Sequence, residues 1–125
     1  MHGKDYVALA MRTNDDKAEM RLRNLMAFER FKIDVGGVLD GVLGLTGEAG
    51  EVSDIIKKWV FHEKPLDIEH FKKELGDVMW YIAMICYSMQ FDLDEILQMN
   101  IDKLEARYPE GFNVERANNR AEGDV

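Results

Sequence analysis

The sequence predicts an all-α protein, a bundle of about four to five helices. In the longest patterned stretches, apolar residues recur at alternating intervals of three and four, as on a helix packed against other helices. No segment alternates apolar and polar residues as a half-buried strand would. The two prolines, Pro65 and Pro109, stand where helical patterns stop and therefore mark connections. We expect residues 1–125 to form one domain, because this length suits a single core.

The first half of the chain carries three expected helices. The first covers about Asp5 to Arg12, and after a polar turn (TNDD) a second amphipathic stretch reaches about Phe31. The third helix extends from about Gly36 to Phe61 and has the clearest pattern. Its apolar stripe consists of Val38, Val42, Leu45, Ala49, Val52, Ile56 and Trp59.

The second half carries two more helices and a polar end. Asp67 can cap a fourth helix. Asp92 and Glu95 form a D-x-x-E capping box for a fifth, which ends before Pro109. The stripe of the fourth helix consists of Ile68, Phe71, Leu75, Val78, Ile82, Ile85 and Met89. We expect residues 113–125 to form a loose C-terminal tail, because this stretch is polar.

The composition argues against several classes of function. Apolar residues make up 46%, as in ordinary folded proteins, and the formal charge of −8 argues against a nucleic-acid partner or an anionic membrane surface. The single cysteine, Cys86, permits no intrachain disulfide and suits a reducing compartment. The start of the chain has no signal-like apolar stretch, and the longest apolar run, Val78 to Met89, is too short to span a bilayer. We therefore expect a cytoplasmic protein without a membrane partner.

Two pairs of acidic residues flank the apolar stripes of the third and fourth helices. Within each pair the spacing is i, i+3, so both carboxylates project from one side of the helix. The pairs are Glu48 and Glu51 on the third helix, and Glu74 and Asp77 on the fourth. An antiparallel hairpin would bring them face to face, where four carboxylates repel one another unless cations intervene. All-oxygen ligands select hard ions, so we expect Mg²⁺, or alternatively Mn²⁺.

Acidic pairs alone are common on solvated helix faces, but the third helix has a second unusual feature. It contains several glycines, and each interior glycine costs roughly 0.5–1 kcal/mol relative to alanine. They are Gly36, Gly37, Gly41, Gly44, Gly47 and Gly50. Their number indicates that something approaches the backbone closely, and close packing of helices would explain some of them.

The fifth helix presents three residues that bind anions well. Asn100, Lys103 and Arg107 lie within about 60° of one another on a helical wheel. An amide, an ammonium and a guanidinium on one face suit a phosphate-bearing ligand, although such a face is also commonly just solvated. Lys58 shares the carboxylate flank of the third helix, and Tyr81 lies one turn beyond Asp77.

Three segments resemble the MazG-like family of all-α nucleoside triphosphate pyrophosphohydrolases: GLTGEAGEVSDIIKKW, KKELGDVMWYIAMI and NIDKLEARYPEGF, in that order. The resemblance covers about Leu43 to Phe112, and DYVALAMRT also resembles the family's opening helix. It implies metal-dependent hydrolysis of a nucleoside or deoxynucleoside triphosphate to the monophosphate and pyrophosphate, as nucleotide-pool housecleaning. It also implies a homodimer or homotetramer with sites built between subunits.

The resemblance assigns roles by motif position. It implies that Glu48, Glu51, Glu74 and Asp77 are metal ligands, that Lys58, Asn100, Lys103 and Arg107 contact phosphates, and that Tyr81 lies near the sugar or base. We expect Glu51, and next Glu48, to accept the proton of the attacking water. Residues 14–35 show no strong match, which leaves the preferred base open.

Other interpretations remain open at this point. A di-iron carboxylate bundle normally supplies Glu-x-x-His from two helices, whereas this chain offers only Asp67-x-x-His70. A non-catalytic helical interaction protein would use the acidic residues only to solvate its surface. Within the enzyme class, a phosphoribosyl-ATP pyrophosphohydrolase-like activity is a related alternative.

Overall fold

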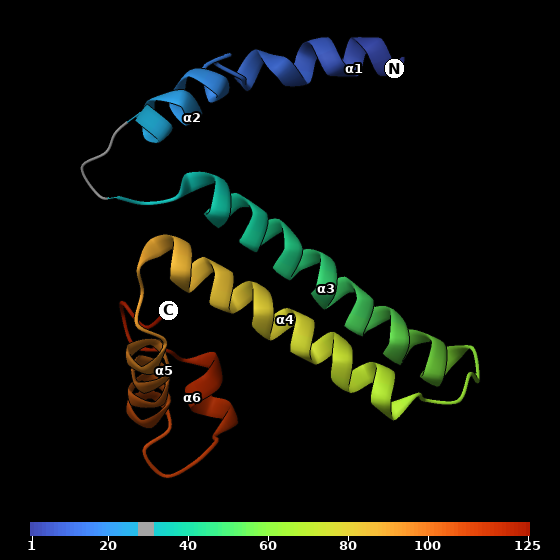
Figure 1. Cartoon of the computed structure of the whole chain (residues 1–125), viewed down its shortest axis with the longest axis vertical. Coiled ribbons are helices and arrows are strands. Elements are labelled where there is room, and N and C mark those ends of the chain that lie inside the picture. The colour runs from blue at the N-terminus through green and yellow to red at the C-terminus, as the bar shows by residue number, and fades with distance from the viewer. Residues whose placement is uncertain (28–31) are drawn as a thin grey trace.

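The computed structural model describes residues 1–27 and 32–125, and helices dominate both ranges (Figure 1). In chain order the elements are α1 (Gly3–Ala10), the 3₁₀ turn η1 (Met11–Thr13), α2 (Ala18–Ala27), α3 (Val35–Phe61), α4 (Ile68–Met89), α5 (Leu93–Arg107) and α6 (Val114–Asn118). Within these residues no strand forms, and an isolated bridge joins Pro109 to Gly111. The expected all-α class is confirmed.

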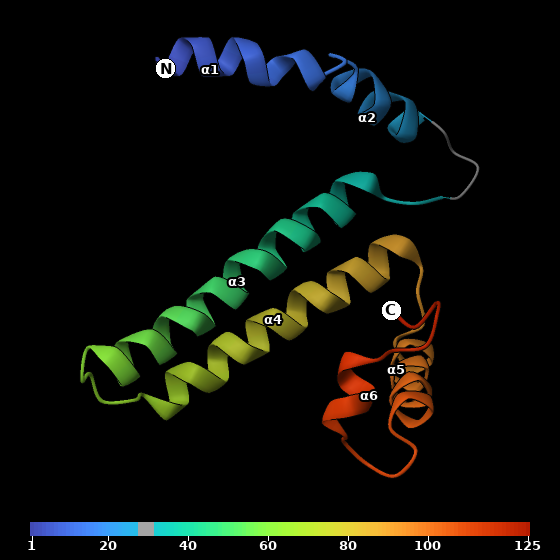
Figure 2. The same cartoon turned by 180° about the vertical axis from the view of Figure 1, so that it is seen from behind.

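The centre of the fold is an antiparallel hairpin of α3 and α4, the two helices that pack most extensively against each other (Figures 1 and 2). Each begins at an aspartate that accepts a hydrogen bond from a backbone N–H three residues later. Asp34 accepts from Gly37 at 3.0 Å, and Asp67 accepts from His70 at 3.0 Å. The backbone N–H of Asp34 also donates to the carbonyl of Ser88 at 3.1 Å, which ties the start of α3 to the end of α4.

Glycines on α3 allow the two helices to approach closely. A Cβ atom at Gly44 would overlap the ring of Tyr81, and one at Gly37 would overlap the hydroxyl of Ser88. A Cβ at Gly41 would likewise come too close to α4, 2.7 Å from a side-chain carbon of Ile85. Helix packing therefore explains these three glycines, which is one of the two explanations that the sequence leaves open.

The ends of the helices follow the sequence pattern with small departures. α1 and η1 together cover the first expected helix, and α3 and α4 have nearly their expected bounds. The second expected helix is described as far as Ala27, and its expected last residues up to Phe31 lie outside the described part of the chain. Asp92 caps α5, but it accepts from the N–H of Asp94 at 2.9 Å rather than from Glu95 as the capping box predicts. Both N–H groups lie in the first turn and lack helical acceptors, so either one can donate to the capping carboxylate of Asp92.

The C-terminal segment is more regular than its composition predicts. We expected residues 113–125 to be loose, but they include α6, whose cap residue Asn113 accepts from the N–H of Arg116 at 3.1 Å. Further on, Asp124 forms an ion pair with Arg107 of α5. The polar composition gave no indication of α6. It gave none of the ion pair either, because a contact between residues 17 apart leaves no periodic signal.

Apolar side chains are widely exposed in the single chain. Cys86, at 8% exposure, is the one buried hydrophobic side chain of the described residues, whereas Leu43 is 71% and Phe61 78% exposed. The accessible surface is 10721 Å², compared with about 6,800 Å² for a compact monomer of 14.4 kDa. A single chain therefore leaves much apolar surface without a partner.

None of the helices in residues 1–27 and 32–125 combines the length and apolar character needed to cross a membrane.

Candidate functional site

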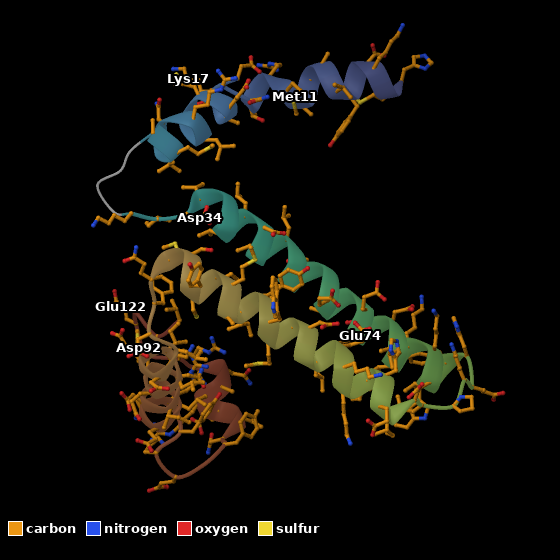
Figure 3. All side chains as sticks on the ribbon, in the orientation of Figure 1. Met11, Lys17, Asp34, Glu74, Asp92 and Glu122 are labelled. Atoms are coloured by element: carbon orange, nitrogen blue, oxygen red, sulfur yellow. The ribbon has the colours of Figure 1, made fainter. Side chains whose placement is uncertain are left out.

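Three of the four predicted acidic residues converge between α3 and α4. Glu48 of α3 and Glu74 and Asp77 of α4 each offer a carboxylate oxygen, and these oxygens lie within 4.8 Å of one another. The antiparallel hairpin brings Glu48 to the level of Glu74 and Asp77, and Figure 3 marks Glu74 on this stretch of α4. Glu48 and Glu74 are partly buried, and Asp77 is exposed. We call these three residues the acidic cluster; as oxygen donors they suit a hard divalent cation.

The neighbouring carboxylates raise the affinity of Glu48 for a proton. The pKa of Glu48 is raised above its ordinary value, first because its carboxyl group shares a hydrogen bond with Glu74, and then because of partial burial. The negative charges of Glu74, Asp77 and Glu51 act in the same direction. A nearby cation would reverse these interactions, so the free cluster is electrostatically prepared for a metal ion.

Glu51 lies outside the acidic cluster and lines a small neighbouring cleft of about 160 Å³ together with Asp54, Lys58 and His70. Nζ of Lys58 lies 2.7 Å from the carboxylate of Asp54, one turn earlier on α3. Their hydrogen bond is the main reason that the pKa of Asp54 is lowered and that of Lys58 raised. Nδ1 of His70 lies 3.7 Å from the carboxylate of Glu74, so the cleft adjoins the acidic cluster.

Two aromatic residues lie beside the acidic cluster. Trp80 and Tyr81 line a cleft of about 360 Å³ with Glu48 and Asp77. Their ring centroids are 5.0 Å apart at an interplanar angle of 87°, an edge-to-face contact. The ring of Tyr81 also lies against the backbone of Gly44, which holds it between the helices. This cleft can accept a flat, uncharged group next to a bound cation.

The three predicted anion-binding residues of α5 are not next to the acidic cluster in a single chain. α5 follows the C-terminal end of α4, at the open end of the hairpin, and does not pack extensively against α3 or α4 (Figures 1 and 2). Asn100 is exposed, and Lys103 and Arg107 line a pocket that α5 forms with the C-terminal segment. Arg107 donates to Asp124 through Nε at 2.8 Å and Nη2 at 2.6 Å.

Sequence reasoning did not select three residues that the structure places at these sites. Trp80 could have been found, because it stands next to Tyr81 in the same motif. Asp54 also carried a signal, since it is four residues before Lys58 on one helix, a spacing that favours an ion pair. Asp124 carried none, because its partner lies on a different element.

Comparisons with known proteins identify the family. The MazG nucleotide pyrophosphohydrolase domain matches residues 39–112, more than half of the chain, and this range contains the acidic cluster and α5. The chain is similar to the Gene 37 protein of Mycobacterium phage L5, with 35% identity over 83 residues, 62% of this chain and 72% of the phage protein. No solved structure matches it significantly. The chain belongs to the MazG nucleotide pyrophosphohydrolase family.

Proposed function

We propose that the protein hydrolyses a nucleoside or deoxynucleoside triphosphate to the monophosphate and pyrophosphate in a metal-dependent reaction. The acidic cluster carries this proposal, because three carboxylates meet within 4.8 Å in a member of a nucleotide pyrophosphohydrolase family. The neighbouring carboxylates disfavour the ionised state of Glu48 unless a cation is present, so the arrangement suits ligand binding better than stability. The proposed biological role is removal of unwanted nucleotides from a cytoplasmic pool.

The residues of the acidic cluster fit Mg²⁺, or alternatively Mn²⁺. Glu48, Glu74 and Asp77 would hold the ion, and Glu51 on the same flank of α3 is available to join them. When bound, such an ion neutralises phosphate charge and lowers the pKa of water. We assign proton acceptance from the attacking water to Glu51, which is exposed beside the cluster. Glu48 is the second candidate, because its carboxyl group is already engaged with Glu74.

Cationic and aromatic side chains would bind the rest of the substrate. We assign Lys58, Asn100, Lys103 and Arg107 to the phosphates, and Tyr81 with Trp80 to the sugar or base. In the free chain Lys58 is paired with Asp54 and Arg107 with Asp124. A phosphate oxygen would therefore take the place of a carboxylate at two of these cations, an exchange of one anion for another on the same donors.

A second copy of the chain would complete the site. The acidic cluster lies on the hairpin, whereas Lys103 and Arg107 lie on α5, which does not pack extensively against it. The exposed apolar surface gives a reason for chains to associate. We propose a homodimer or homotetramer in which α5 of one chain serves the acidic cluster of another.

The direct test is pyrophosphate release from a panel of canonical and modified nucleoside and deoxynucleoside triphosphates, with and without Mg²⁺. The panel includes phosphoribosyl-ATP, so that the related activity is scored in the same assay. We expect release that requires the metal and that differs between bases. If no member is hydrolysed at any Mg²⁺ or Mn²⁺ concentration, the proposed function is wrong.

The position of bond cleavage has its own test. In ¹⁸O-labelled water, attack at the α-phosphorus places the label in the nucleoside monophosphate and leaves pyrophosphate unlabelled. Label in orthophosphate, together with a nucleoside diphosphate, would show that a different bond is broken.

A further inference from the structure

The C-terminal segment and α5 together form a cationic pocket. Its volume is about 530 Å³, and its wall includes four basic residues, two from α5 and two from the C-terminal segment. We call it the C-terminal pocket; its basic residues are Lys103, Arg107, Arg116 and Arg120. Both views of the chain show α6 and the C-terminus beside α5 (Figures 1 and 2). Four of the chain's 16 basic residues thus gather in one place, although the formal net charge is −8.

The carboxylate of Asp124 occupies this pocket. It accepts from Nε of Arg107 at 2.8 Å and from Nη2 at 2.6 Å, a two-pronged contact. The two side chains are only 10% and 16% exposed, so the pair is largely shielded from water. The pKa of Asp124 is lowered chiefly by this hydrogen bond, against the opposing effect of burial. The charges of Arg120 and Lys103 lower it further, so several cations of the pocket act on one anion.

The geometry of this ion pair is that of an anion bound by a guanidinium fork. Arginine takes a phosphate with the same two parallel N–H donors with which it takes a carboxylate. A phosphate-bearing anion carries more charge than one carboxylate and has more acceptor oxygens. It would therefore use Arg116 and Arg120, for which the structure shows no side-chain hydrogen bond or ion pair among the described residues.

We propose that the C-terminal pocket is a binding site for a phosphate-bearing anion, with Asp124 as its internal occupant in the free chain. Arg116 and Arg120 complete the site, and the incoming anion displaces Asp124 from Arg107. The proposal rests on the proposed function, which assigns Lys103 and Arg107 to the substrate phosphates; it adds Arg116 and Arg120 as further ligands and Asp124 as the competitor that keeps the site closed. The competing interpretation is a structural ion pair that simply anchors the C-terminal segment to α5.

The two interpretations predict opposite effects of one substitution. If Asp124 competes with the anion, Asp124→Asn should bind pyrophosphate about tenfold more tightly, since a charged hydrogen-bonded competitor has been removed. If the pair only anchors the segment, Asp124→Asn should bind pyrophosphate no better than the wild type. Glu122→Gln is the matched control, because Glu122 lines the same pocket but is not the carboxylate that Arg107 binds, so the variant removes the same charge without removing the competitor.

The experiment is isothermal titration of the full chain with pyrophosphate in EDTA, where the acidic cluster holds no metal. We expect tighter binding by Asp124→Asn, and binding at least several-fold weaker than wild type by Arg116→Ala and Arg120→Ala. Equal affinities for Asp124→Asn and Glu122→Gln would overturn the proposal, as would wild-type affinity in both arginine variants. Thermal unfolding of each variant checks that it is folded. Because no turnover is measured, an inactive enzyme with the expected titrations would overturn only the proposed function.

A second measurement follows the C-terminal segment itself. In the wild type, saturating pyrophosphate should increase amide hydrogen exchange in residues 119–125, because the anion releases Asp124 from Arg107. Unchanged or slower exchange would contradict displacement. Steady-state kinetics then identify the source of the anion. A lower KM for the triphosphate in Asp124→Asn assigns the pocket to the substrate, whereas a change confined to pyrophosphate inhibition assigns it to the free product.

Discussion

The stability of this protein should depend on its concentration. The accessible surface of the single chain, 10721 Å², exceeds the roughly 6,800 Å² of a compact monomer of the same mass by about 3,900 Å². A standard protein–protein interface covers about 800 Å² on each partner. The excess is therefore several times what an ordinary complex buries, and it is the size expected where chains fold and associate together.

Dilution is the perturbation that tests this reasoning. Near 60 °C a tenfold dilution changes the free energy of a dimer relative to two unfolded chains by about 1.5 kcal/mol. The unfolding entropy of a 125-residue chain is about 0.26 kcal/mol per kelvin, so the dimer's Tm should fall by about 3 °C per tenfold dilution. The same calculation for a tetramer gives about 4 °C, and a monomer shows no change.

The assay is thermal unfolding followed by circular dichroism between 1 and 100 µM chain, with light scattering on the same samples. A dimer should lose about 6 °C over this range and a tetramer about 9 °C. A constant Tm together with a monomeric mass and full activity would refute the inference from exposed surface.

Three further predictions concern the acidic cluster and the hairpin. Asp77→Asn and Glu51→Gln should each lower kcat at saturating Mg²⁺ by at least about 100-fold without lowering the Tm in EDTA. Asp40→Asn, which changes an exposed acid of α3, is the control. Near-normal turnover in Asp77→Asn or Glu51→Gln would contradict the role assigned to that residue. In EDTA, Glu48→Gln should be more stable than wild type at pH 7, and the difference should shrink as the pH falls toward the ordinary glutamate pKa of 4.5. The sign follows because a raised pKa means that the folded state binds the proton more tightly, so ionisation of Glu48 destabilises it as the pH rises; a difference in Tm independent of pH would contradict this. Gly44→Ala should lower the Tm, because its Cβ would overlap the ring of Tyr81. The Cβ of Gly47→Ala would meet open space within the chain, so this variant should gain roughly 0.5–1 kcal/mol of stability from helix propensity. Equal effects of the two substitutions on the Tm would mean that close packing does not explain Gly44.

The hairpin was predictable because its signals are local and periodic. The two apolar stripes and the cap at Asp67 depend on residues within a few turns of one another. Once both helices are known and their connection is short, antiparallel packing follows, and it brings Glu48 opposite Glu74 and Asp77. The convergence of these three acids therefore follows from the spacing of the residues along two helices and from the length of the connection between them.

What the sequence did not predict depends on contacts without a period. The ion pair of Arg107 with Asp124 joins α5 to a polar segment for which we expected no regular structure. A pairing of this kind depends on where one element lies relative to another, which composition and periodicity do not encode. The pair of Asp54 with Lys58 is different, because its i, i+4 spacing within α3 is a local signal that the sequence does carry.

The distribution of paired and unpaired charges bears on the order in which ligands would bind. The acids of the acidic cluster lie next to one another, which raises the pKa of Glu48, whereas Lys58 and Arg107 are already neutralised by Asp54 and Asp124. A triphosphate approaching this chain without a metal would meet unpaired negative charge at the acidic cluster, and at Lys58 and Arg107 it would meet cations already paired with carboxylates. A divalent cation would neutralise the acidic cluster. The phosphates would then compete with Asp54 and Asp124 for Lys58 and Arg107. Under the proposed function, this favours capture of the nucleotide together with its metal ion, because the acidic cluster repels the nucleotide alone and two of the cations assigned to its phosphates are paired with carboxylates.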